Sequence, residues 1–108
     1  MTFKELVIAI VTEGHSDLVM NAAKQAGAQK GTVILGEAFA DMNLSDVIQI
    51  PTKEKREVIL IVCDSAIRDA VIRTINDSVP LDSTGRGMVF SMSVEKYLDT
   101  SGKKTSIS

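Results

Sequence analysis

Two short segments hold residues whose types and spacing could do chemistry. The first is Glu13-Gly14-His15-Ser16, which contains the only histidine of the 108 residues. A histidine at the turn between two elements could act as a general acid or bind a metal ion. No cysteine, second histidine or carboxylate cluster lies near it in the sequence, so the pattern favours a turn or capping role for His15.

The second segment is Thr84-Gly85-Arg86-Gly87. Two glycines let backbone N–H groups converge on an anion, and the arginine between them can supply a fork of donors. The same Gly-x-Gly spacing is also typical of an ordinary tight turn before a strand. On spacing alone, the turn is the better interpretation.

The other reactive side chains do not form a catalytic set. The single cysteine, Cys63, ends an apolar run, which favours a small buried hydrophobe over a nucleophile. Asp17, Asp64 and Asp69 match helix starts or solvated faces, and no spacing pairs two carboxylates for acid–base work. An acylphosphatase-like enzyme would need an arginine in the loop at 12–16, which has none. The sequence therefore predicts neither an enzyme nor a metal site.

Composition and charge narrow the classes of function. A chain of 108 residues with 44% hydrophobic and 24% charged residues is typical of one globular domain. The net charge of −2 offers no electrostatic footprint for nucleic acid or an anionic membrane. A single cysteine excludes an intrachain disulfide, and neither a cleavable leader nor an apolar run of about 20 residues is present. We therefore expect a cytoplasmic protein.

Six elements must position these residues. Apolar runs rich in valine and isoleucine, or alternating apolar and polar residues, predict four strands. The strands are expected at Leu6–Val11, Thr32–Leu35, Glu57–Asp64 and Met88–Val94. Apolar residues at three- and four-residue spacing predict a helix capped by Ser16 and ended by Gly27, and another that starts at Asp64 or Ser65 and ends at Val79.

The order of the elements predicts an α+β fold, a ferredoxin-like βαββαβ sandwich with a four-stranded antiparallel sheet and two helices on one face. Two helices can cover only one face of such a sheet. The strands at Leu6–Val11 and Glu57–Asp64 nevertheless carry apolar residues at both odd and even positions, and therefore on both faces of the sheet. We therefore expect the open face of the sheet to form a subunit interface.

Two segments show no periodicity. Residues 36–50 mix apolar and acidic residues before Pro51, and long irregular connections in compact domains are often functional. From Thr100 to Ser108 the chain has little to bury, which predicts a flexible C-terminal tail.

The motifs taken together resemble PII-like proteins, the nitrogen regulatory protein P-II superfamily. The resemblance is carried by Glu13–Ser16, Gly27–Thr32, the apolar third strand and Thr84–Val94, and it covers about residues 5 to 98. It implies a PII-like domain over residues 1–99, a T-loop at about 37–50, a B-loop at about 81–87 and a tail at 100–108. It also implies a homotrimer with the sheets packed inward.

The resemblance further implies a small-molecule effector bound in each intersubunit cleft. Thr32 would lie near the base, Ile10 would line the pocket, and the amides of Gly85–Gly87 would face phosphates. The implied ligand-binding residues are Ile10, Thr32, Gly36, Glu37, Ala38, Thr84, Gly85, Arg86, Gly87 and Met88. Family members sense adenine nucleotides or related metabolites, and they use the T-loop to grip a target such as a membrane transporter or an enzyme.

The sequence departs from the family where phosphate would be bound. Met88 stands where typical members have a lysine, and Asp99 and Ser101 stand where they have two arginines. Ala38 replaces a glycine near the base of the T-loop, although Gly36 is close. Three possible charge-assisted contacts to phosphate are thus lost. We expect a divergent signal-transduction protein whose ligand carries less charge than ATP, such as AMP, another adenylyl compound or a different small anion.

Two alternatives remain open from the sequence. One is a CutA-like trimer that binds cations or is purely structural, although one histidine and one cysteine are few ligands. The other is a monomeric ferredoxin-like enzyme.

Overall fold

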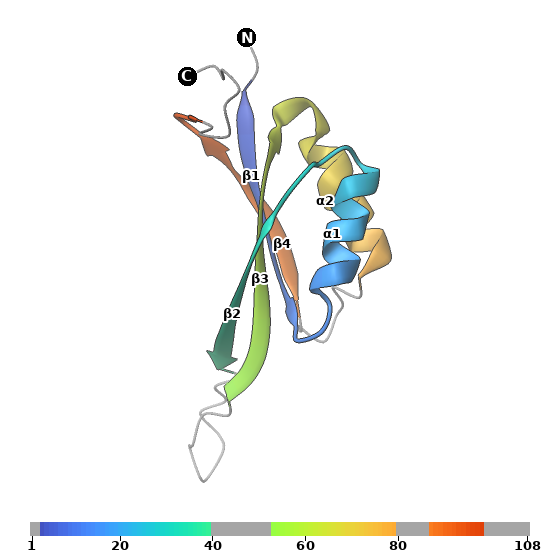
Figure 1. Cartoon of the computed structure of the whole chain (residues 1–108), viewed down its shortest axis with the longest axis vertical. Helices are drawn as coiled ribbons and strands as arrows, with labels where there is room; N and C mark the ends of the chain where they lie inside the picture. Colours follow the sequence, from blue (N-terminus) through green and yellow to red (C-terminus); the bar gives the residue numbers. More distant parts are fainter. Residues whose placement is uncertain (1–2, 40–52, 80–86, 99–108) are drawn as a thin grey trace, which may run out of the picture.

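The computed structural model describes residues 3–39, 53–79 and 87–98. The elements are β1 (Lys4–Thr12), α1 (Ser16–Gln25), β2 (Thr32–Phe39), β3 (Lys53–Asp64), the 3₁₀ turn η1 (Ser65–Ile67), α2 (Arg68–Ser78) and β4 (Met88–Val94), as Figure 1 shows. Their order confirms the strand, helix, strand, strand, helix, strand pattern predicted from the sequence.

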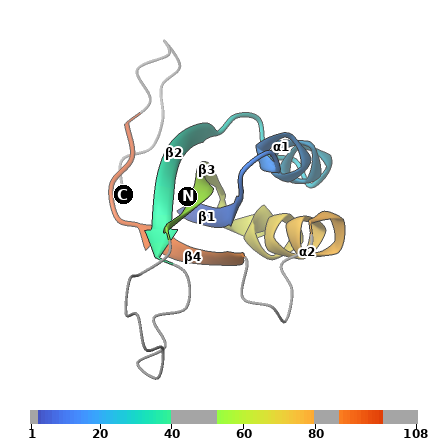
Figure 2. The ribbon, with the colours of Figure 1, turned by 90° about the horizontal axis from the view of Figure 1, so that it is seen from below.

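The four strands form one antiparallel sheet in the order β2-β3-β1-β4. Both helices lie on the same side of it, so the molecule has two layers (Figure 2). This is the ferredoxin-like α+β arrangement predicted from the sequence. In the parts of the chain that the structure describes, no helix is both long and apolar enough to cross a bilayer.

The core lies between the sheet and the helices. Burial alternates strictly along β1, where Val7, Ala9 and Val11 are buried and the residues between them are only partly covered. The same alternation runs along β3 through Ile59 and Ile61. The largest fully buried side chains are Ile59, Ile61, Ile75, Val7, Val11, Val19 and Val71. The helix-facing side of the sheet is therefore the hydrophobic core.

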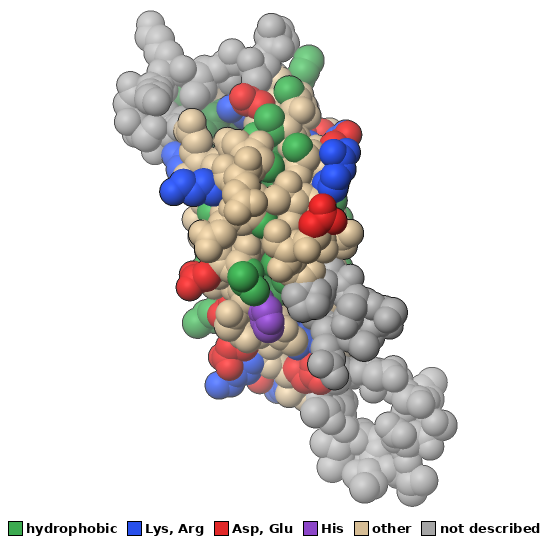
Figure 3. Space-filling view, turned by 90° about the vertical axis from the view of Figure 1, so that its right-hand side faces the viewer, with side chains coloured by type: hydrophobic (Ala, Val, Ile, Leu, Met, Phe, Trp, Pro, Cys, Tyr) green, Lys and Arg blue, Asp and Glu red, His purple; other side chains and the backbone are tan. Residues whose placement is uncertain are grey.

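The other side of the sheet, here called the open face, is also apolar. The strand registers place on it Leu6, Ile8, Ile10, Ile34, Val58, Leu60, Val62, Met88, Phe90, Met92 and Val94. Met88 and Met92 are each 54% exposed, and Phe90 is 41% exposed. On the helix-covered side, by contrast, hydrophobic side chains are scattered among charged ones (Figure 3). The prediction of a sheet that is apolar on both faces but covered on one is confirmed.

Strands β2 and β3 are longer than the sequence predicted. Strand β1 ends at Thr12, opposite Arg56, but β2 and β3 stay paired as far as Phe39 and Lys53 (Figure 1). Neither α1 nor α2 lies over this two-stranded extension, so its residues show no hydrophobic alternation (Figure 1). Glu37, Ala38 and Phe39, predicted to start the T-loop, therefore belong to β2. Residues 40–50 of that predicted loop lie outside the described residues.

The start of α1 also differs from the prediction. Ser16 is the first helical residue instead of the cap, and His15 occupies the N-cap position without a side-chain capping bond. The backbone N–H of Ser16 instead donates to the Glu57 carboxylate at 2.9 Å. The predicted stop is confirmed, since Gly27 has a φ of +110°, which a glycine adopts without strain.

Candidate functional site

A pocket of about 280 Å³ lies on the open face. It is lined by Lys30, Gly31, Thr32, Leu60, Val62, Tyr97 and Leu98. These residues come from the start of β2, the middle of β3 and the segment after β4. Its volume is slightly below the usual range for small-molecule sites, about 300 to 1,000 Å³, so it suits a small ligand.

The floor of the pocket is made by β3. Leu60 and Val62 both point to the open face, and Thr32 lies directly opposite Leu60 in the β2–β3 register. Residues directly opposite each other in an antiparallel pair share a face of the sheet. The floor is therefore apolar, with the Thr32 hydroxyl at one edge.

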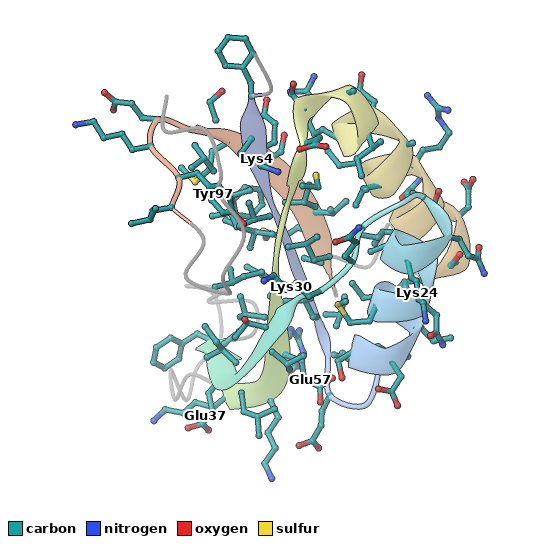
Figure 4. All side chains as sticks on the ribbon, turned by 45° about the horizontal axis from the view of Figure 1, so that its top comes forward. Lys4, Lys24, Lys30, Glu37, Glu57 and Tyr97 are labelled. Carbon is teal, nitrogen blue, oxygen red and sulfur yellow. The ribbon has the colours of Figure 1, made fainter. Side chains whose placement is uncertain are left out.

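The linker between α1 and β2 forms the second side of the pocket. A Cβ atom at Gly31 would lie 2.6 Å from Met20 Sδ and 3.2 Å from Ile61 Cγ1. Only glycine lets the linker pass this close to the core without displacing those side chains. Lys30, which precedes it, brings a positive charge to the pocket (Figure 4).

The third side is the segment that follows β4, which runs on the side of the sheet away from the helices (Figure 2). The Lys4 ammonium lies 5.1 Å from the centre of the Tyr97 ring, which is cation–π range. Lys4 also binds Asp64 Oδ1 at 2.6 Å, and this bond raises the pKa of Lys4 above its ordinary value of 10.5. Tyr97 therefore stands beside a charged pair at the end of the open face.

The structure places several of the predicted site residues on the open face. Thr32 lines the pocket, whereas Ile10 and Met88 lie opposite each other in the β1–β4 register. Gly36 lies opposite Arg56, four residues along β2 from Thr32 and so about 13 Å away. Ile10 and Met88 are thus brought together, but they do not line the pocket at Thr32.

The remaining predicted residues divide into two groups. Glu37 and Ala38 are consecutive in β2 and so point to opposite sides of the sheet. Gly87 directly precedes β4. Thr84, Gly85 and Arg86 lie outside the described residues.

The sequence did not predict that the Arg56 side chain would be mostly buried and ion-paired, because Arg56 lies in a run of mixed charges. Its side chain is only 11% exposed, and its Nη2 binds Glu54 Oε2 at 2.6 Å. Gly36, opposite it, leaves open space where a Cβ would stand. The sequence does contain a signal for its position. Arg56 lies at every second residue from Val58 and Leu60 along β3, so its side chain lies on the same face of the sheet as theirs.

His15 has the turn role that its sequence context favours. Its Nδ1 lies 3.1 Å from the Thr12 hydroxyl and 3.2 Å from the Thr12 carbonyl oxygen. Across residues 3–39, 53–79 and 87–98, no three side chains of the His, Cys, Asp and Glu types gather as metal ligands.

Comparison with known proteins gives a fold but no sequence family. No protein-family model and no curated protein matches the sequence. The GlnK–ATP complex of B. subtilis superposes with a TM-score of 0.74 at 17% identity, covering 94% of this chain and 92% of that one. A Bacillus cereus protein related to NIF3 gives a TM-score of 0.67 at 15% identity, covering 88% of this chain but 26% of that one. Since GlnK is a PII protein, the fold is PII-like.

Proposed function

We propose that this chain is a cytoplasmic PII-like signalling protein, a sensor with no enzymatic activity of its own. It binds a small molecule, with an adenine nucleotide as the leading candidate, and regulates a partner protein through residues 37–50. The observation that carries the proposal is that Thr32, which the family resemblance places near a base, lines a pocket of ligand size. The PII-like fold supports the same interpretation.

The open face supports the assembly that this function requires. Contiguous apolar surface of this kind marks a protein interface, because leaving it in water is unfavourable. In the proposed homotrimer the three sheets pack inward through the open face. The pocket at Thr32 then borders the cleft between two subunits.

The ligand is proposed from the site and the comparison together. The solved GlnK structure contains ATP, which makes an adenine nucleotide a compatible ligand class for this chain. Met88, at the position of a family lysine, favours a ligand with fewer charges than ATP.

We propose that β2 transmits the effect of ligand binding from the pocket to the predicted T-loop. This strand runs without interruption from Thr32 at the pocket to Phe39, next to the remainder of the predicted T-loop. A transporter or an enzyme is the kind of target that such a loop would grip.

Light scattering on the purified chain tests the assembly. We expect a mass three times the 11.6 kDa of the chain. Phe90→Lys, on the open face, should yield monomers. Leu18→Lys on α1 is the matched control and should leave the trimer intact, since the two residues are similarly exposed at 41% and 45%. A monomeric wild-type protein would reject the trimer.

Calorimetry tests the ligand. Titration with AMP, ADP and ATP should show binding of at least one, and Thr32→Val should weaken it because the pocket loses its hydroxyl. If no adenine nucleotide binds, the proposed ligand class is wrong.

A further inference from the structure

The described lining of the pocket carries a single positive charge. Of the described residues that line it, Lys30 alone is charged, while Thr32 and Tyr97 are polar but neutral. Leu60, Val62, Leu98 and Gly31 supply apolar or bare backbone surface. A ligand there meets one cationic side chain of the described lining.

Another cation, Lys4, lies beside the pocket but is not among the residues that line it. Lys4 contacts the Tyr97 ring and is bound to Asp64 at 2.6 Å. Lys30 extends from the linker before β2, on the other side of the floor. Its ammonium is a compact charge with three donors, which suits one phosphate or one carboxylate.

The shape of the pocket favours a flat ring. Leu60 and Val62 form an apolar floor, and the Tyr97 ring supplies an aromatic wall. Aromatic rings pack against such surfaces by offset or edge-to-face contact. The Thr32 hydroxyl can donate to, or accept from, one polar atom at the edge of the ring.

We infer that this pocket selects a flat aromatic molecule that carries one anionic group, and that Lys30 binds that group. The inference rests on the proposed function for the location of the ligand, and it adds the class of ligand and the residue that recognises its charge. A nucleoside monophosphate and an aromatic carboxylate share this chemistry. A triphosphate would bring further charges that no described lining residue offsets.

Calorimetry with charged and neutral pairs of probes tests the inference on the full chain. The pairs are AMP with adenosine, and indole-3-carboxylate with indole. Because a charge-assisted hydrogen bond contributes about 1.5 to 3 kcal/mol, the charged member of a recognised pair should bind at least about tenfold more tightly. Lys30→Gln should remove that preference and leave the neutral member's affinity unchanged.

Two controls make the result specific to this pocket. Lys24→Gln removes an exposed lysine on α1, in the other layer of the molecule, and should leave all affinities unchanged (Figure 4). Tyr97 is the only tyrosine of the chain, so incorporation of 3-fluorotyrosine gives a single ¹⁹F resonance from the pocket wall. Binding in the pocket should shift that resonance.

The outcomes separate the inference from the proposed function. If indole-3-carboxylate binds with Lys30-dependent selectivity over indole and no adenine nucleotide binds, the adenine ligand is wrong and the inference stands. If Lys30→Gln changes the affinity for AMP and for indole-3-carboxylate by less than about twofold, the inference is overturned. Binding that leaves the Tyr97 resonance unmoved overturns the inference while the adenine ligand survives, and no binding by any probe overturns both.

Discussion

Glu57 and Ser16 are 41 residues apart in the sequence, yet the Glu57 carboxylate accepts the backbone N–H of Ser16 at 2.9 Å. Hydrogen bonds from the backbone of Gly14, Ser16 and His15 hold the pKa of Glu57 below its ordinary value of 4.5, with Gly14 contributing most. A buried side chain of β3 thus fixes the turn between β1 and α1. It does so where the positive end of the helix dipole favours a carboxylate.

Replacement of Glu57 by glutamine should destabilise the fold. The amide has the shape of the carboxylate but no charge, so its bonds to the backbone N–H groups are weaker. We expect a lower urea midpoint at pH 7 for Glu57→Gln. Glu13→Gln, which changes an exposed carboxyl in the same turn, should leave the midpoint unchanged, and equal losses for both variants would contradict the role of Glu57.

The same carboxyl gives the stability a defined pH dependence. Because the folded pKa of Glu57 is lower than its ordinary value of 4.5, its contribution is present above that pH and is lost as pH falls through the folded value. The difference in unfolding free energy between wild type and Glu57→Gln should be constant near neutrality and should shrink below about pH 4.5. Urea titrations at a series of pH values measure it, and a difference that grew with acid would refute the assignment.

Arg68→Ala should destabilise the protein by about 1 to 3 kcal/mol, because it leaves the buried carboxylate of Glu5 without its cation. Arg68 Nη1 binds Glu5 Oε1 at 3.0 Å, and the other oxygen, Glu5 Oε2, is buried without a hydrogen-bond partner. Urea unfolding gives the loss directly. The double variant Glu5→Leu with Arg68→Ala should lose less than Arg68→Ala alone, since no buried charge remains.

The second ion pair of Arg68, with Asp69, provides a control for this prediction. Its Nε binds Asp69 Oδ1 at 2.8 Å, but the Asp69 side chain is 74% exposed. Exposed ion pairs contribute little, so Asp69→Asn should change the unfolding free energy by less than about 1 kcal/mol. A larger loss there than for Arg68→Ala would mean that the surface pair, and not the buried one, dominates.

Gly31→Ala should destabilise by about 1 to 3 kcal/mol through overpacking. The added Cβ would lie 2.6 Å from Met20 Sδ, so that side chain must move. A double-mutant cycle with Met20→Ala tests the cause, because the penalty of the added methyl group should fall when the Met20 side chain is absent. Equal penalties in both backgrounds would place the strain elsewhere.

Cys63 should react slowly with iodoacetamide in the folded protein. The residue is only 5% exposed, and burial raises the pKa of its thiol above the ordinary value of 9.0. Both effects reduce the exposed thiolate that alkylation requires. The rate should rise sharply in denaturing urea, and equal rates in the two conditions would show that the thiol is accessible.

The order of elements could be predicted because its signals are local. The run Val58–Cys63 and the alternation of Met88–Val94 each identify a strand without reference to the rest of the chain. The end of β2 and the start of β3 could not be predicted in this way. There Glu37 and Phe39 pair with Lys55 and Lys53 beyond the end of β1, where neither face packs on the core.

The site was predictable only at Thr32, which belongs to a motif that resembles a known family. Lys30, Leu60 and Tyr97 meet it in the pocket because of sheet register and the path of the chain after β4, and no local pattern relates positions 30, 60 and 97. The capping of α1 was missed for the same reason. A local signal favoured Ser16, whereas the acceptor comes from another strand.

The middle of β3 is apolar at every position from Val58 to Cys63, so this run does not tell one side of the sheet from the other. A slip of one residue would turn every side chain over. The two ends of the strand remove the ambiguity, since Glu57 reaches the start of α1 on one side and Asp64 reaches Lys4 on the other. Two carboxylates therefore encode the alignment of a central strand whose hydrophobic interior leaves that alignment unspecified.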